Sequence, residues 1–312
     1  TVLSRGLGDV YKRQSDGWSS GILTNEFIEL YNALKENRKA LLPELTLQYT
    51  DYAIWQRKYL EGEVLESQLT YWEEKLNEVS ILRLPTDYAR PAIQSTEGAS
   101  ISLELNEELT SSLKELCKEE GVTLFMFLLA TFKVLLYRYT GQTDICVGTP
   151  IANRTQSELE GIIGFFVNTL ALRSDLSKTP SFKEVLKKVK TNTLESYDNQ
   201  LAPFERVVER VVTTRDMSTT ALFQVMFDLN NTAGQGTSSI EGLDIYPYNF
   251  EGKTSQFDLS LSAGENASGI SLAMNYCTAL FKEETIQCML VHYQELLTSI
   301  VNDIQKPINS LS

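Results

Sequence analysis

The chain has 312 residues, with 41 Asp and Glu against 28 Lys and Arg, so its formal net charge is −13. This acidic balance argues against a nucleic-acid-binding protein, because neutralising phosphates requires a basic face. The apolar share of 42% and the aromatic share of 10% are ordinary for a globular protein, and the length suggests two domains or lobes.

The cysteines and the single histidine give no sign of a metal site. Cys117, Cys146, Cys277 and Cys288 are far apart in the sequence, none belongs to a C-x-x-C pair, and the only histidine is His292. These spacings do not match those of zinc sites, and nothing in them calls for disulfides. We therefore expect no bound metal.

The longest apolar stretch, residues 124–137, is interrupted by Lys133. It is too short to cross a bilayer about 30 Å thick. Residues 1–14 contain no apolar segment typical of a signal peptide. We therefore expect a cytoplasmic protein with no membrane partner.

Helical periodicity dominates the first part of the chain. Apolar residues recur at i, i+3, i+4 and i+7 over Asn25–Asn37, which predicts a helix with Thr24 as its N-cap. Similar stripes predict helices over Thr50–Leu60 and Val64–Val79. The next segment, 84–98, is rich in Pro, Ser, Thr and Gly, and we interpret it as the crossing between two lobes.

Beyond this crossing the pattern alternates between strands and helices. Asn106 is expected to cap a helix that Gly121 ends, and the other helices are predicted over Leu124–Tyr139, Ser181–Tyr197, Pro203–Val212 and Lys282–Ile300. Strands are predicted over Ile101–Leu105, Asp144–Ile151, Phe165–Leu172, Leu222–Leu229, Leu243–Tyr248, Phe257–Leu261 and Ile270–Tyr276, the last two as a hairpin. This mixture predicts an α/β or α+β two-layer sandwich, one sheet covered by helices.

Five sequence strings follow one another in a fixed order. They are Ser15-Asp16-Gly17-Trp18-Ser19, Tyr49-Thr-Asp51-Tyr52-Ala53-Ile54-Trp55-Gln56, Ile163-Gly164-Phe165-Phe166-Val167-Asn168-Thr169, Asn199-Gln200-Leu201-Ala202-Pro203-Phe204-Glu205, and Arg215-Asp216-Met217-Ser218 continuing to Leu222-Phe223. The first resembles the right half of the H-H-x-x-x-D-G motif of nonribosomal peptide synthetase condensation domains. The others resemble that family's Y-x-D-Y/F-A-x-W, I-G-x-F-V-N-T, H/N-Q-x-x-P-F-E and R-D-x-S…L-F motifs. A single string is weak, but the ordered set is specific.

The resemblance implies a bilobed fold similar to chloramphenicol acetyltransferase. Residues 96–312 would form the complete C-terminal lobe, and residues 15–95 the end of the N-terminal lobe with the lobe-crossing helices. Upstream and downstream peptidyl carrier proteins would deliver thioesters on phosphopantetheine arms, beside a neighbouring adenylation domain. The acceptor's α-amine would attack the donor's thioester carbonyl to form an amide, with no cofactor bound directly by the domain.

The resemblance also implies roles for four residues. Asp16 is expected in a buried salt bridge that shapes the site, with Arg154 or an arginine of the absent lobe as its partner. Backbone N–H groups near Gly17 are expected to stabilise an oxyanion. Trp18 and Asn168 are the candidate substrate-binding residues. Core packing of Trp18 and a backbone-bridging role for Asn168 are the competing interpretations, and for both residues we favour the structural one.

One departure from the family pattern concerns the catalytic base. The motif's two histidines would fall at positions 11 and 12, where this chain has Tyr11 and Lys12. A protonated ammonium accepts no proton, so we expect the chain as given to be inactive. The string at 9–14 resembles a translated sequencing-library adapter, and we interpret residues 1–14 as a non-native segment joined to a domain that lacks its N-terminal half. A genuine, catalytically dead paralogue is the alternative.

Two other functions fit the same fold. A non-catalytic platform that docks carrier proteins is favoured if Tyr11 and Lys12 are taken literally. An epimerisation domain shares the fold and remains open. Cyclisation is disfavoured, because cyclisation domains carry aspartates in place of the histidines.

Overall fold

The computed structural model describes residues 14–178, 180–214, 216–230, 243, 253–266 and 269–311. The chain divides into two compact units. The small unit comprises Thr1–Gln68, Ile151–Asn168 and Gly234–Asn249, and the sheet unit comprises Leu69–Pro150, Thr169–Ala233 and Phe250–Ser312. Tyr11, Lys12, Arg215 and, apart from Leu243, the strand predicted over Leu243–Tyr248 lie outside the described residues.

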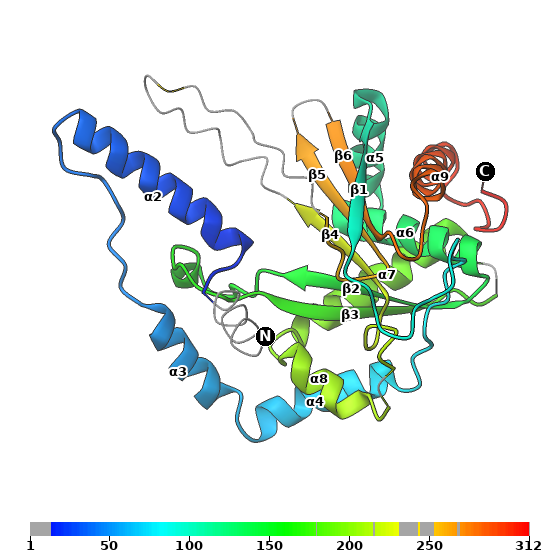
Figure 1. Cartoon of the computed structure of the whole chain (residues 1–312), viewed down its shortest axis with the longest axis horizontal. Helices are drawn as coiled ribbons and strands as arrows, with labels where there is room; N and C mark the ends of the chain where they lie inside the picture. Colours follow the sequence, from blue (N-terminus) through cyan, green and yellow to red (C-terminus); the bar gives the residue numbers. More distant parts are fainter. Residues whose placement is uncertain are drawn as a thin grey trace. The chain divides into compact units, whose positions relative to one another are not determined.

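The sheet unit is built on six described strands in the order β1-β6-β5-β4-β2-β3 (Figure 1). Strands β1 and β5 run antiparallel to β6, whereas β4 runs parallel to both β5 and β2. The predicted hairpin is therefore confirmed as β5 and β6. The strands are β1 (Gly98–Leu105), β2 (Asp144–Ile151), β3 (Asn168–Asp175), β4 (Val225–Asn230), β5 (Leu259–Asn266) and β6 (Gly269–Cys277).

Helices form the second layer of this unit. Helix α6 packs on α7, α9 and β4, while α5 and α9 contact β6 and α9 also contacts β1. The prediction of one sheet covered by helices is thus confirmed. The helices of this unit are α5 (Glu107–Glu119), α6 (Leu124–Thr140), α7 (Phe182–Asp198), α8 (Phe204–Val211) and α9 (Glu283–Asn302), and α4 (Glu63–Leu76) begins in the small unit and ends in this one.

Local sequence signals account for most helix ends in the sheet unit. The Asn106 side chain accepts a hydrogen bond from the Leu109 N–H at 2.9 Å, as an N-cap does. Gly121 and Gly141 adopt φ values of 61° and 68°, the left-handed conformation that ends a helix. Helix α6 is apolar almost all round, and every residue from Met126 to Leu136 is buried.

No single helix in the described part of the chain has both the length and the apolar character needed to span a membrane. Helices α5 and α6 reach that threshold only as a pair, across a bend of 105°.

The small unit contains helices α2 (Gly17–Lys35) and α3 (Tyr49–Tyr59) and the 3₁₀ turn η1 (Ser157–Leu159). Helix α2 begins at Gly17 rather than at the predicted Asn25. Its N-cap is Asp16, and the hydroxyl of Thr24 instead donates to the backbone carbonyl of Ser20 at 2.9 Å. The N-cap prediction was wrong because it rested on the spacing of apolar residues. That spacing does not reveal the turn of Gly, Trp and Ser at the start of the helix, which the Asp16 carboxylate holds.

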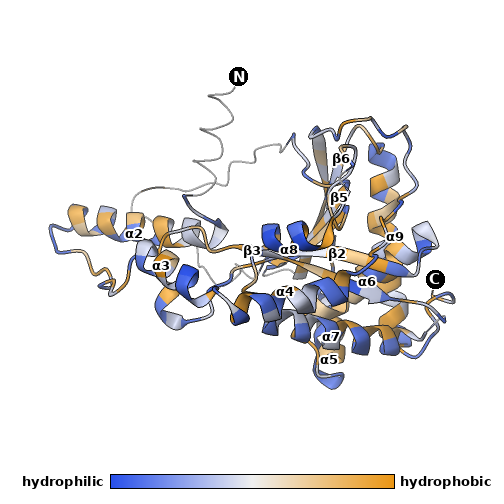
Figure 2. Cartoon of the chain, turned by 90° about the horizontal axis from the view of Figure 1, so that it is seen from below, coloured by the Kyte–Doolittle hydropathy of each residue, from blue (hydrophilic) through white to orange (hydrophobic). Residues whose placement is uncertain are grey.

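Helix α2 also carries apolar side chains that stay exposed. Leu23, Phe27 and Leu34 are 60%, 61% and 82% exposed, and Figure 2 shows hydrophobic residues along this helix. Phe27 and Leu34 belong to the apolar stripe from which the sequence predicted the helix, so the stripe indicated helical geometry but not burial.

Candidate functional site

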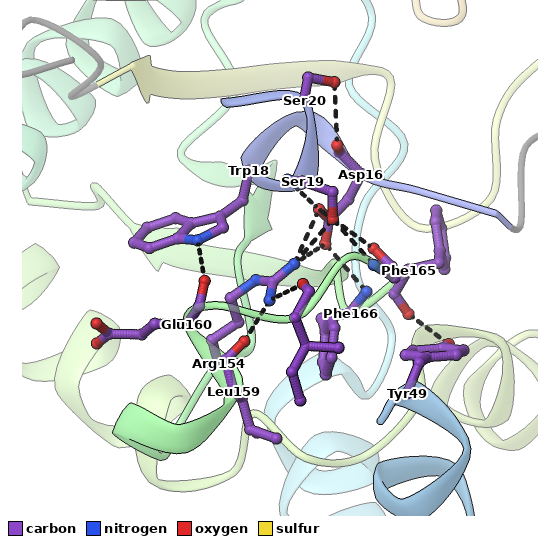
Figure 3. A network of polar contacts seen from close by, with 12 residues as sticks. Asp16, Trp18, Ser19, Ser20, Tyr49, Arg154, Leu159, Glu160, Phe165 and Phe166 are labelled. Atoms are coloured by element: carbon purple, nitrogen blue, oxygen red, sulfur yellow. Dashed lines mark hydrogen bonds and ion pairs between the residues drawn. The ribbon is translucent and has the colours of Figure 1, made fainter. Parts of the chain in front are cut away.

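The first motif forms a turn that is built around the Asp16 carboxylate (Figure 3). Asp16 Oδ1 accepts a hydrogen bond from the Ser19 backbone N–H at 2.9 Å, and the Ser19 hydroxyl oxygen lies 2.7 Å from the same atom. The carboxylate thereby satisfies one of the four N–H groups that the first turn of a helix leaves free. The helix start and the motif are therefore one structure.

A buried ion pair anchors this turn to a distant segment. The Arg154 Nη2 atom lies 3.2 Å from Asp16 Oδ1, and the two side chains are only 1% and 4% exposed. Arg154 also donates through Nη1 to the backbone carbonyls of Leu159 and Ile162. Its guanidinium lies 4.0 Å above the centre of the Phe166 ring. Asp16 was expected to pair with Arg154 or with an arginine of the absent lobe, and the structure shows the pair with Arg154.

The electrostatics keep Asp16 ionised. Burial by itself raises the pKa of Asp16, but the hydrogen bonds from Ser19 and Phe166 and the charge of Arg154 outweigh it, so the pKa lies below its ordinary value of 3.8. A carboxylate held in this way is a poor proton acceptor near neutral pH. Asp16 therefore serves as a structural support for the turn.

The segment Gly164-Phe165-Phe166 is held through its backbone. The Asp16 N–H donates to the Gly164 carbonyl at 3.2 Å, and the Phe166 N–H donates to Asp16 Oδ2 at 3.0 Å. The Ser19 hydroxyl lies 3.1 Å from the Gly164 nitrogen and 2.8 Å from its oxygen. The first and third motifs, about 145 residues apart, therefore form one hydrogen-bonded cluster.

The second motif packs against the same segment. The Tyr49 hydroxyl donates a hydrogen bond to the Phe165 carbonyl oxygen at 2.7 Å. A Cβ at Gly164 would lie 2.3 Å from the Tyr49 ring, so only glycine fits there. Tyr52 is buried with its ring 4.6 Å from that of Phe166.

The two candidate substrate-binding residues differ in how exposed they are. Trp18 is 44% exposed, so the preferred interpretation of Trp18 as a core residue was wrong. Its indole Nε1 donates to the Glu160 carbonyl at 2.9 Å, which fixes the ring at the surface. Asn168 is the first residue of β3 and is partly buried. The predicted start of this strand at Phe165 was wrong, because the backbone there binds Asp16 and Tyr49 rather than a neighbouring strand.

Sequence reasoning missed Ser19, which is 1% exposed and contacts Asp16, Gly164 and Arg154. The available signal was Asp16 itself, because an Asp N-cap accepts a hydrogen bond from the backbone N–H two or three residues later, which here belongs to Ser19. It also missed the hydrogen bond from Tyr49 to the Phe165 carbonyl, because a contact between residues 116 positions apart leaves no local sequence pattern.

The geometry offers one feature for chemistry. The first turn of α2 leaves N–H groups near Gly17 without helical partners, and they carry the partial positive charge of the helix end. Gly17 is exposed, and an added Cβ there would meet no atom of the described residues within 4 Å. Among the described residues, nothing therefore blocks the approach of an anionic oxygen to this turn.

Other parts of the described chain offer less. No group of three or more His, Cys, Asp or Glu side chains among the described residues is arranged to hold a metal ion. A depression of about 960 Å³ lies in the sheet unit, between the end of α4, α8 and the segment 211–222. None of the candidate site residues lines it.

Comparison with known proteins identifies the family. The condensation-domain family model matches residues 14–312, and the chain therefore belongs to the condensation-domain family. One linear gramicidin synthase subunit of Brevibacillus parabrevis is 47% identical over 98% of this chain, but the chain spans only 6% of that protein's length. Gramicidin S synthase 2 of Aneurinibacillus migulanus is 43% identical over 95% of this chain, which again spans 6% of the relative.

Solved structures with the same fold include the X-domain from teicoplanin biosynthesis. It superposes with a TM-score of 0.84 at 26% identity, over 96% of this chain and 69% of that one, and it has also been solved in complex with OxyB. The epimerization domain from the third module of tyrocidine synthetase B superposes with a TM-score of 0.75 over 94% of this chain and 68% of that one. Its identity is 18%, so this likeness concerns the fold alone.

Proposed function

We propose that the domain joins two carrier-bound substrates through an amide bond. The observation that carries this proposal is the buried Asp16–Arg154 pair, which holds the Asp16–Gly17 turn at the start of α2. Bringing two tethered reactants together in a fixed geometry can lower a barrier by about 7–11 kcal/mol in favourable cases. That effect requires a rigid frame, and a turn with buried, hydrogen-bonded supports supplies one.

In the proposed reaction, the acceptor's α-amine attacks the carbonyl carbon of the donor thioester. A C–N bond forms, the C–S bond breaks, the nitrogen loses a proton, and the donor's phosphopantetheine thiol leaves. The negative charge that develops on the carbonyl oxygen would be stabilised by backbone N–H groups near Gly17, where no side chain of the described residues blocks the approach. Trp18, whose ring is exposed, would contact the substrates, whereas for Asn168 we keep the structural role as the favoured one and substrate contact as the alternative. The substrates would arrive on upstream and downstream carrier proteins of a synthetase that also contains an adenylation domain.

The base for this reaction would be the second histidine of the family motif, which precedes the turn. In this chain Lys12 stands at that position. A lysine ammonium cannot take the proton. We therefore propose that the chain as given does not form amides, although its turn has the supporting structure for that reaction.

The test transplants residues 15–312 into the linear gramicidin synthase relative, in place of the aligned segment, so that the relative supplies the residues before the turn. Loaded donor and acceptor carriers are added, and the amide product is measured by mass spectrometry. We expect product from this hybrid and from the unmodified relative. A hybrid that binds both carriers with the relative's affinity yet forms no amide would refute the proposal.

The same hybrid tests the two alternatives. A docking platform is favoured by Tyr11 and Lys12, and it would bind carriers without changing their loaded amino acids. An epimerisation domain would change the ratio of D to L amino acid on a single loaded carrier. Chiral analysis of the released amino acid separates these outcomes.

A further inference from the structure

A single peptide group connects Tyr49 to Asp16. The Tyr49 hydroxyl donates to the Phe165 carbonyl oxygen at 2.7 Å, and the Phe166 N–H donates to Asp16 Oδ2 at 3.0 Å. The Phe165 carbonyl and the Phe166 N–H belong to the same peptide bond, which resonance keeps planar. Figure 3 shows Tyr49 and Asp16 on the two sides of this peptide.

We propose that Tyr49 is a positioning residue for the Asp16–Gly17 turn and that it acts through this peptide. A donor on the carbonyl oxygen polarises the amide, which makes its N–H a stronger donor to a carboxylate, because chained hydrogen bonds reinforce one another. The peptide plane also cannot rotate without breaking one of the two bonds. Tyr49 thereby fixes the direction from which Asp16 is held.

The surroundings of Tyr49 leave it little freedom. Its ring lies edge-on to Phe166 with the ring centres 5.1 Å apart, and it occupies the space that a side chain at Gly164 would need. Helix α3 begins at Tyr49, and the Gln48 N–H donates to the Asp51 carboxylate at 2.8 Å. In the second motif, Asp51 thus fixes the start of the helix from which Tyr49 reaches the peptide.

Tyr52, on the same helix, provides a matched comparison. Its ring also packs on Phe166, but its buried hydroxyl has no hydrogen-bond partner in the described part of the chain. Burial raises the pKa of Tyr52 to about 12, so this hydroxyl stays neutral. Tyr49→Phe and Tyr52→Phe therefore remove the same atom from neighbouring residues, but only the first removes a bond to the peptide.

The first test measures hydrogen exchange of the Phe166 amide in the chain itself by NMR. Loss of one ordinary hydrogen bond predicts an increase of about fivefold in Tyr49→Phe and no increase in Tyr52→Phe. Thermal melting of each variant checks that the fold is retained. Equal exchange in the two variants would overturn the proposal.

The second test rests on the proposed function and uses the hybrid enzyme. Tyr49→Phe should lower kcat about three- to tenfold with unchanged KM for both carriers, whereas a purely structural role would leave kcat unchanged once the protein is folded. An unchanged kcat would overturn the positioning role while leaving amide formation intact. If the hybrid without either substitution forms no amide, the proposed function fails, and the exchange experiment still decides whether Tyr49 fixes the peptide.

Discussion

Replacing Asp16 by Asn isolates the contribution of the buried charge. Asn keeps an oxygen for the Ser19 N–H, so the helix cap survives. Its amide has only one acceptor oxygen, and with that oxygen kept at the Oδ1 position for Ser19, the amide nitrogen faces the Phe166 N–H. Breaking a buried pair by removing one charge costs about 3–5 kcal/mol, and because the Arg154 guanidinium keeps two carbonyl partners we expect about 3 kcal/mol.

Urea unfolding followed by tryptophan fluorescence measures this loss. With a slope of about 2–3 kcal/mol per molar urea, the midpoint should fall by roughly 1–1.5 M at neutral pH. Asp175→Asn is the matched control, because Asp175 holds the Ser177 N–H and hydroxyl, both at 2.8 Å, but is exposed. Its midpoint should change far less.

The pH dependence tests whether charge is the cause. The folded chain holds the pKa of Asp16 below 3.8, so its stabilisation is complete above that pH and is lost as the pH falls through the folded value. The gap between the unmodified chain and Asp16→Asn should therefore close in acid. A gap that stays constant down to about pH 3, or equal midpoints at neutral pH, would refute the reasoning.

Three further predictions concern glycine, lysine and cysteine residues. Gly148→Ala places a Cβ 2.2 Å from the buried Phe223 ring and should cost about 1–3 kcal/mol in urea unfolding, whereas Gly17→Ala should not destabilise the fold. Burial lowers the pKa of Lys133 from 10.5 to about 7, so between these pH values Lys133 is protonated in the unfolded chain and neutral in the folded chain. The free energy of unfolding should therefore rise with pH across this range. Lys133→Met should remove this rise. Cys288 is the only exposed thiol of the four cysteines, so a thiol reagent should titrate one group in the native chain and four after unfolding.

Local patterns were sufficient for much of the sheet unit. The alternation over Ile101–Leu105, the cap at Asn106 and the glycine at 121 each act within a few residues, so periodicity and turn chemistry located β1 and both ends of α5. The ordered motifs by themselves indicated the condensation-domain family. These features depend on residue spacing, which a sequence displays directly.

The site required the tertiary structure. Arg154 lies 138 residues from Asp16, and Tyr49 lies 116 residues from the carbonyl that it binds. Their bonds to Asp16 and to the segment 164–166 determine where α2 begins and why β3 starts at Asn168. Burial also required the tertiary structure, because Trp18 and Leu34 are apolar residues of the kind found in cores but remain exposed. Sequence spacing determined which elements form, and the folded chain alone decided which carboxylate meets which cation, because hydrogen bonds and ion pairs act over a few ångströms of space and not along the chain.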